Sequence, residues 1–221
     1  MDKRINDYNK RFKDNSPQDL LTYFLNEHKG KIKLASSLGA EDQVLTDMVL
    51  NIDPKASIFV LDTGRLNQET YDVMADTMAH YSMRYQVYYP EQKAVETLLH
   101  QKGPNSFYES VENRKECCSI RKVVPLNIAL GNCAAWITGL RREQAVTRQS
   151  LDPVEWDEAH QCIKLNPLFN WTTDQVWNYI KQNKVPYNKL HDQGYPSIGC
   201  APCTRAIGKD DDIRAGRWWW E

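Results

Sequence analysis

The sequence lacks long hydrophobic runs, a secretory signal and an excess of charge of either sign. No stretch approaches the roughly 18 consecutive apolar residues of a membrane span, and the first six residues carry no apolar signal core. The 28 Lys and Arg residues almost balance the 29 Asp and Glu residues, leaving a net charge of −1. These absences argue against a membrane protein, a secreted protein and a nucleic-acid binder. We therefore expect a cytoplasmic protein, whose cysteines serve as ligands or catalysts rather than as disulfides.

Short apolar runs that predict strands alternate with longer stretches that predict helices. Strands are expected at 32–35, 57–61, 84–88 and 133–138, with helices between them. This alternation predicts an α/β fold with a mostly parallel sheet flanked by helices. A chain of 221 residues suits a single domain of this kind.

The second half of the chain gives weaker signals. Residues 151–161 are polar and are expected to form a loop, whereas 162–166 alternates like a half-exposed or edge strand. Capping-box spacing at 172–175 predicts a helix to about residue 183. An acidic run at 210–212 is suited to a helix N-terminus.

Polar turns follow the first two expected strands, where α/β sheets bind ligands. The turn residues are Ser36, Ser37, Leu38 and Gly39 after the first strand and Asp62, Thr63, Gly64 and Arg65 after the second. A turn of small residues before a helix can direct backbone N–H groups at a phosphate. The first turn alone is a weak signal, because many such turns bind nothing.

Arginines follow the strand at 133–138. Arg141 and Arg142 come directly after its end, with Arg148 close behind. Arginine binds phosphate or sulfate with two parallel hydrogen bonds. Surface ion pairs with Glu143 or Asp152 are the alternative. Arg214 and Arg217, three residues apart, could similarly clamp an anion or form a solvated face.

Two pairs of cysteines are the most specific signal. Cys117 and Cys118 are adjacent, and Cys200 and Cys203 lie on a turn rich in Gly and Pro. Four thiolates in two pairs fit an iron–sulfur cluster. Zinc, a thioredoxin-like dithiol and incidental buried cysteines are the alternatives. A helix through this region would place Arg121 and Lys122 on the faces of Cys117 and Cys118. Cys133 and Cys162 are expected to be strand or core residues, not ligands.

Taken together, these residues resemble the assimilatory adenosine 5′-phosphosulfate (APS) reductases, relatives of the phosphoadenosine phosphosulfate (PAPS) reductases. The resemblance runs in order through 37–42, 61–66, 115–126, 138–144, 166–177, 197–206 and 213–220. It implies an adenine-nucleotide α-hydrolase-like fold. It also implies reduction of APS to sulfite and AMP through an S-sulfocysteine, with thioredoxin as the reductant.

The resemblance also implies roles for particular residues. Those implied to contact the nucleotide are Ser36, Ser37, Gly39, Asp62, Thr63, Gly64, Arg65, Leu66 and Gly139. Those implied to hold the phosphosulfate or to line its cleft are Lys122, Arg214, Arg217, Arg141 and Arg142. Those implied to bind a [4Fe-4S] cluster are Cys117, Cys118, Cys200 and Cys203. The family's attacking cysteine lies in a segment that would follow Glu221, so the chain as written is expected to bind substrate without turnover.

Other functions remain open from the sequence. PAPS reduction, or reduction of both nucleotides, is one alternative. A non-catalytic iron–sulfur protein that binds a nucleotide or senses redox state is another. A homo-oligomer is compatible with the sequence, and no nucleic-acid or membrane partner is expected.

Overall fold

The structure is a computed structural model that describes residues 2–208 and 210–221. The strands are β1 (Ile32–Ser36), β2 (Ser57–Leu61), β3 (Gln86–Tyr88), β4 (Ala135–Ile137), β5 (Val154–Asp157) and β6 (Cys162–Leu165). The helices are α1 (Asp2–Phe12), α2 (Pro17–Glu27), α3 (Ala40–Ile52), α4 (Gln68–His80), α5 (Gln92–Lys102), α6 (Val111–Cys118), α7 (Val124–Leu130) and α8 (Thr173–Asn183). A π-helical turn, Ser119–Val123, joins α6 to α7.

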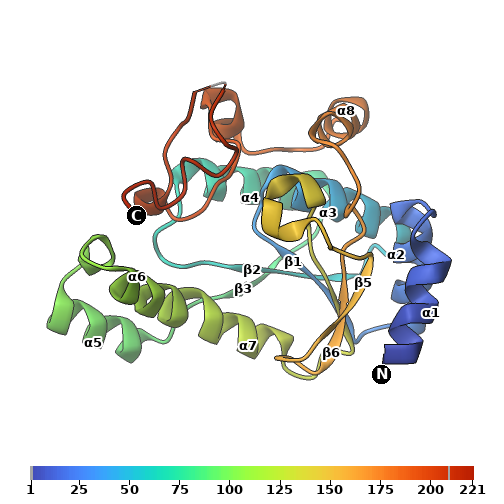
Figure 1. Ribbon diagram of the computed structural model, residues 1–221, viewed down its shortest axis with the longest axis horizontal. Helices are drawn as coiled ribbons and strands as arrows, with labels where there is room; N and C mark the ends of the chain where they lie inside the picture. The colour runs from blue at the N-terminus through green and yellow to red at the C-terminus, as the bar shows by residue number, and fades with distance from the viewer. Residues whose placement is uncertain (1, 209) are drawn as a thin grey trace.

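The strands form one sheet in the order β3-β2-β1-β4-β6-β5. All neighbouring strands are parallel except β5 and β6, which are antiparallel. Leu34 of β1 lies opposite Ile58 on one side and Ile137 on the other, and all three side chains are buried. Helices α3 and α4 cover one face of the sheet, with α8 packed on the outer side of α3, and α6 and α7 lie on the other face (Figure 1). The predicted α/β architecture is therefore confirmed.

Local sequence signals explain where several elements begin. Ser16 and Asp19 form the capping box of α2, and Thr172 and Gln175 form that of α8. Helix α3 is buried on nearly every side, because it lies between the sheet, α2 and α8. Asp47 of α3 accepts hydrogen bonds from Tyr81 at 2.8 Å and from Tyr179 at 2.7 Å. These bonds fix α4 and α8 to α3, the helix that begins directly after the polar turn following β1.

Several expectations about the second half of the chain were wrong. The segment 151–161 contains strand β5, whose Val154 is fully buried and is held through both backbone polar groups by Asn9 of α1. Strand β6 lies between β4 and β5, so it is not an edge strand. Cys133 precedes β4 instead of belonging to it. Helix α1, which covers β5, was not predicted.

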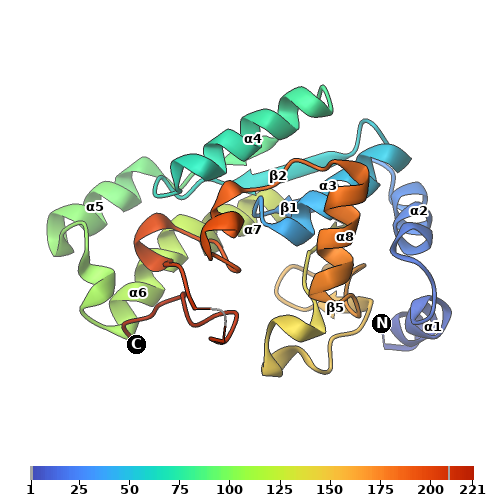
Figure 2. The ribbon, with the colours of Figure 1, turned by 90° about the horizontal axis from the view of Figure 1, so that it is seen from above.

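The C-terminal segment is irregular and packs beside α6 (Figures 1 and 2). Arg114 of α6 binds the Glu221 carboxylate through two hydrogen bonds of 2.6 and 2.8 Å. The acidic run at 210–212 does not begin a helix; instead Asp212 accepts a hydrogen bond from the backbone N–H of Arg214. No helix in the described part of the chain is long and apolar enough to cross a membrane.

Candidate active site

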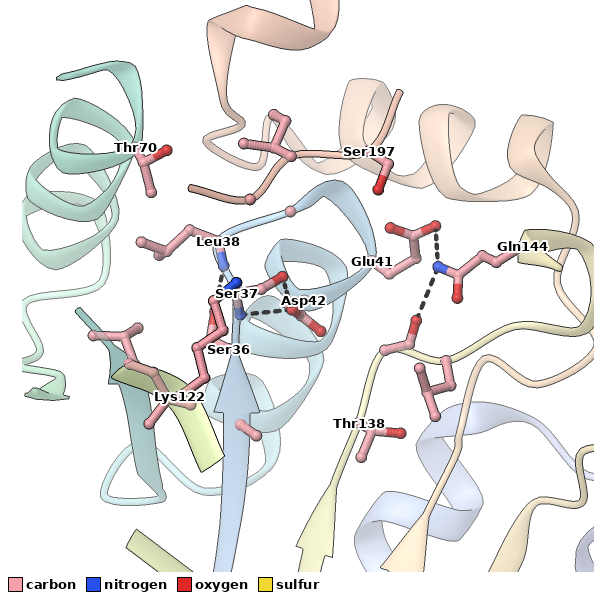
Figure 3. A pocket seen from close by; sticks show the side chains of 18 of the residues that line it. Ser36, Ser37, Leu38, Glu41, Asp42, Thr70, Lys122, Thr138, Gln144 and Ser197 are labelled. Atoms are coloured by element: carbon pink, nitrogen blue, oxygen red, sulfur yellow. Dashed lines mark hydrogen bonds between the residues drawn. The ribbon is translucent and has the colours of Figure 1, made fainter. Parts of the chain in front are cut away.

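A cavity of about 410 Å³ opens at the carboxyl ends of β1, β2 and β4 (Figure 3). The chain moves from β1 toward β2 and β3 in one direction, while β4 lies on the other side of β1. Open α/β sheets bind ligands at such a reversal of strand order. The sequence correctly predicted that these strand ends would meet. The volume is within the range of small-molecule sites.

The turn after β1 forms one wall of the cavity and is held together by its own side chains. Leu38 has a left-handed backbone, with φ of 62°, and a buried side chain. Its N–H donates to Ser36 Oγ at 3.1 Å, and the N–H of Ser37 donates to Asp42 Oδ2 at 2.7 Å. These two N–H groups are therefore occupied within the turn and are not free to bind a phosphate.

Asp42 fixes both this turn and the one after β4. It also accepts a hydrogen bond from Ser37 Oγ at 2.5 Å. Gly139 lies so close to it that a Cβ atom there would collide with Asp42 Oδ1. Burial raises the pKa of Asp42 to about 6, although the hydrogen bonds from Ser37 act in the opposite direction.

This raised pKa predicts a pH-dependent stability. The carboxyl pKa is about 3.9 in an unfolded chain and about 6 in the folded protein. Because the folded state holds the proton more tightly, the stabilisation is complete below about pH 4 and is lost as the pH rises through 6. We expect the unfolding free energy of the wild type, minus that of Asp42→Asn, to fall by up to about 3 kcal/mol between pH 4 and pH 7 in urea titrations. A difference that stays constant over this range would contradict the assignment.

Four cationic side chains line the cavity: Lys122, Arg148, Arg214 and Arg217. None of them makes an ion pair with a carboxylate in the described part of the chain. The Arg217 guanidinium packs directly on Gly199, where a Cβ atom would collide with it. Burial lowers the pKa of Arg217, and its Nε is buried with no partner among the described residues. A buried cation without a counter-ion is costly, so this end of the cavity is suited to an anion.

Arg141 and Arg142 do not line this cavity, contrary to the prediction. Arg141 is 1 % exposed, and its guanidinium binds Glu41 at 2.9 Å and Glu143 at 3.0 Å. Arg142 turns away, donates to the carbonyl of Leu151 and lies over the ring of Phe169. Of the three arginines after β4, it is Arg148 that reaches the cavity.

Some residues of the turn after β2 line the cavity, and others face away from it. Thr63 and Leu66 line the cavity together with Ser36, Ser37, Gly39 and Gly139. Asp62, Gly64 and Arg65 are not among the lining residues. Asp62 is buried beneath the turn, where it accepts hydrogen bonds from the N–H of Gly64 at 2.8 Å and from Tyr71 at 3.0 Å. Arg65 lies over the ring of Phe107, on the side of the cysteines.

Cys117, Cys118, Cys200 and Cys203 line one small cavity next to the first. The pKa of Cys203 is raised to about 11, mainly by burial and also by the thiolate charges of the other three cysteines, while Lys122 acts in the opposite direction. Thr63 Oγ1 and Cys200 Sγ are hydrogen-bonded at 3.2 Å. Lys122 lines both cavities, so the thiol site and the cationic end of the larger cavity adjoin.

The donor set fits a cluster held by cysteines. Four thiols from two chain segments converge, and Arg65, Arg121 and Lys122 lie around them. Thiolate-bound clusters are anionic, and such cations offset that charge. Among residues 2–208 and 210–221, no three Cys, His, Asp or Glu side chains are arranged to hold a single metal ion.

The remaining two cysteines lie at the amino ends of β4 and β6, whereas the cavity lies at the carboxyl ends of the strands. Cys162 begins β6 and is 1 % exposed, and Cys133 precedes β4. Burial raises the pKa of both thiols, that of Cys162 to about 11. Neither lines the larger cavity.

The fold and the two adjoining cavities define an α/β protein of the adenine-nucleotide α-hydrolase-like class, equipped with a four-thiol site. Residues 31–206 match the model of the phosphoadenosine phosphosulfate reductase domain, and the chain belongs to this family. It is 51 % identical over 203 residues to an adenosine 5′-phosphosulfate reductase of Burkholderia cepacia, covering 92 % of this chain and 81 % of the relative. It is 50 % identical over 190 residues to the enzyme of that name from Allochromatium vinosum, covering 86 % of this chain and 74 % of the relative.

Solved structures support the fold. A PAPS reductase from Candida auris, in a phosphate complex, superimposes with a TM-score of 0.79 at 30 % identity, covering 94 % of this chain and 98 % of that one. An FMN adenylyltransferase from Candida glabrata superimposes with a TM-score of 0.58 at 18 % identity, covering 93 % of this chain and 68 % of that one. The second likeness concerns the fold alone.

Proposed function

We propose that this protein is an APS reductase of sulfate assimilation, reducing APS to sulfite and AMP. The observation that carries the proposal is a set of four cations that line a nucleotide-sized cavity beside four convergent thiols and make no ion pair with a carboxylate among the described residues. The relatives named APS reductases, at about half identity, support this substrate.

In this proposal Lys122, Arg148, Arg214 and Arg217 bind the phosphosulfate end of APS. A thiolate attacks the sulfur of the sulfate group, the bond between that sulfur and the bridging oxygen breaks, and AMP leaves with the electron pair. The cations offset the negative charge that develops on the departing phosphate. A dithiol reductant, thioredoxin, then attacks the S-sulfocysteine and releases sulfite. A homo-oligomer is compatible with this scheme.

Cys117, Cys118, Cys200 and Cys203 would hold a [4Fe-4S] cluster. When bound, such a cluster would join the two segments and place an anionic group next to Lys122; the thiol chemistry takes no electrons from it. Arg121 would stabilise the turn after β2 next to the cluster, because its Nη1 donates to the carbonyl of Thr63 at 2.7 Å. Thr63 would thereby be fixed between the cluster and the nucleotide.

None of the six cysteines of the chain fits the role of the attacking thiol. Four would be committed to iron. Cys162 is buried and Cys133 is half-buried, both lie at the amino ends of strands away from the cavity, and burial raises the pKa of both thiols. We therefore expect the 221-residue chain to bind APS without forming an S-sulfocysteine. Intact-mass spectrometry after incubation with APS tests this. A sulfonate adduct on Cys133 or Cys162 would identify that residue as the nucleophile and contradict our assignment.

Competition between nucleotides tests the proposed substrate. Labelled APS bound to the anaerobically purified protein is displaced with unlabelled APS, PAPS or AMP. We expect APS to displace the label at the lowest concentration. Tighter binding of PAPS would instead indicate a PAPS reductase, and failure of all three nucleotides to compete would exclude a sulfonucleotide site.

A further inference from the structure

The segment after β4 folds around the side chain of Gln144. The amide Nε2 donates to Glu41 Oε1 at 2.9 Å and to the carbonyl of Gly139 at 3.3 Å. The amide Oε1 accepts from the N–H of Arg141 at 3.1 Å and from the guanidinium of Arg148. The opposite orientation of the amide would set its oxygen against two other oxygens, so the network fixes which way it points.

Every hydrogen-bonding position of Gln144 is thereby used within the protein. A primary amide offers two N–H donors and two acceptor lone pairs, and the four partners account for all of them. Gln144 borders the nucleotide cavity, where Figure 3 shows its side chain directed at Glu41. Its amide therefore has no group left with which to bind a ligand.

Arg141 and Glu41 hold Gln144 and its hydrogen-bond partners in place. The Arg141 guanidinium binds Glu41 and Glu143 and also donates to the carbonyl of Trp171 and to Thr173 Oγ1 at the start of α8. Glu41 Oε1 receives both Arg141 and Gln144, which ties the start of α3 to the segment after β4. Arg141 thus anchors the segment without reaching the cavity.

Arg148 is the group that this network directs into the cavity. Among the described residues its one side-chain hydrogen bond is to Gln144, and no carboxylate pairs with it. Arg148 and Arg214 line the same cavity. Burial and the charge of Arg214 lower the pKa of Arg148, and the charge of Glu41 acts in the opposite direction. Without a fixed partner, Arg148 would be expected to move away from Arg214 toward solvent.

We propose that Gln144 is a positioning residue that holds the Arg148 guanidinium beside Arg214, so that both can bind the anionic end of the nucleotide. This inference rests on the proposed function for the identity of the ligand, APS. Gln144 acts through Arg148 and contributes nothing to binding when Arg148 is absent.

A double-mutant cycle tests the proposal. Gln144→Met keeps the length of the side chain and removes both polar ends. It is measured alone and together with Arg148→Ala. The control is Gln92→Met, at an exposed glutamine of α5 whose side chain donates to Glu96. We expect Arg148→Ala to weaken APS binding at least about tenfold and Gln144→Met about fivefold. In the Arg148→Ala background, Gln144→Met should change the affinity less than about twofold. Equal losses in both backgrounds would overturn the proposal.

A crystal structure of Gln144→Met gives a readout that needs no ligand. We expect the Arg148 side chain to leave the cavity wall while the strands and thermal stability stay close to those of the control variant. An Arg148 guanidinium that keeps its place would overturn the proposal. If the wild type fails to bind APS but Arg148 still moves in the variant, the positioning role stands and the proposed substrate is wrong.

Discussion

Replacing Cys200 with serine is expected to abolish iron binding by the anaerobically purified protein. The four thiols around the small cavity come from two segments far apart in the chain, so losing one ligand opens the cluster to solvent and weakens the link between them. The wild type should carry about four irons per chain. Iron and acid-labile sulfide analysis, together with the visible absorption spectrum, measures the result.

Cys133→Ser is the matched control, because its thiol lies before the amino end of β4, away from the four-thiol site. It should retain its full iron content. Stoichiometric zinc in place of iron in the wild type, or an unchanged iron content in Cys200→Ser, would contradict the assignment of the four cysteines.

The second large effect concerns the cations of the larger cavity. Lys122→Ala, Arg214→Ala and Arg217→Ala should each weaken APS binding by about 1.5–3 kcal/mol, since each removes a charge-assisted hydrogen bond to the sulfate end. AMP, which lacks the sulfate, should lose less. Calorimetric titration of both nucleotides into each variant measures the difference.

Arg205→Ala serves as the control on the same C-terminal segment, because Arg205 is exposed and lies over the ring of Trp219 outside the cavity. Its affinity for APS should match that of the wild type. Equal losses for AMP and APS in the three test variants would place the cations at the AMP phosphate instead of the sulfate.

Features that depend on neighbouring residues could be predicted from the sequence. The strand Ser57–Leu61 is a short apolar run and lies where it was expected. The start of α8 follows from its capping box. The two cysteine pairs converge as their spacing indicated. Because parallel strands place their carboxyl ends together, the position of the cavity followed from the same local signals.

The direction of a side chain could not be predicted when it depends on a distant partner. Arg141 resembles an anion ligand in the sequence, but Glu41, a hundred residues earlier in the chain, takes its guanidinium. Arg148 reaches the cavity through its bond to Gln144. The polar sequence of 151–161 predicts a loop and misses strand β5, because the burial of this strand is created by Asn9 and the rest of α1.

A crystal structure of the protein with APS bound, grown without oxygen, tests the central claim most directly. Our account predicts that the nucleotide fills the cavity at the carboxyl ends of β1, β2 and β4, with its sulfate within hydrogen-bonding distance of Arg217 and at least one of Lys122 and Arg214. An APS molecule whose sulfate points away from these three cations, or one bound outside this cavity, would contradict it.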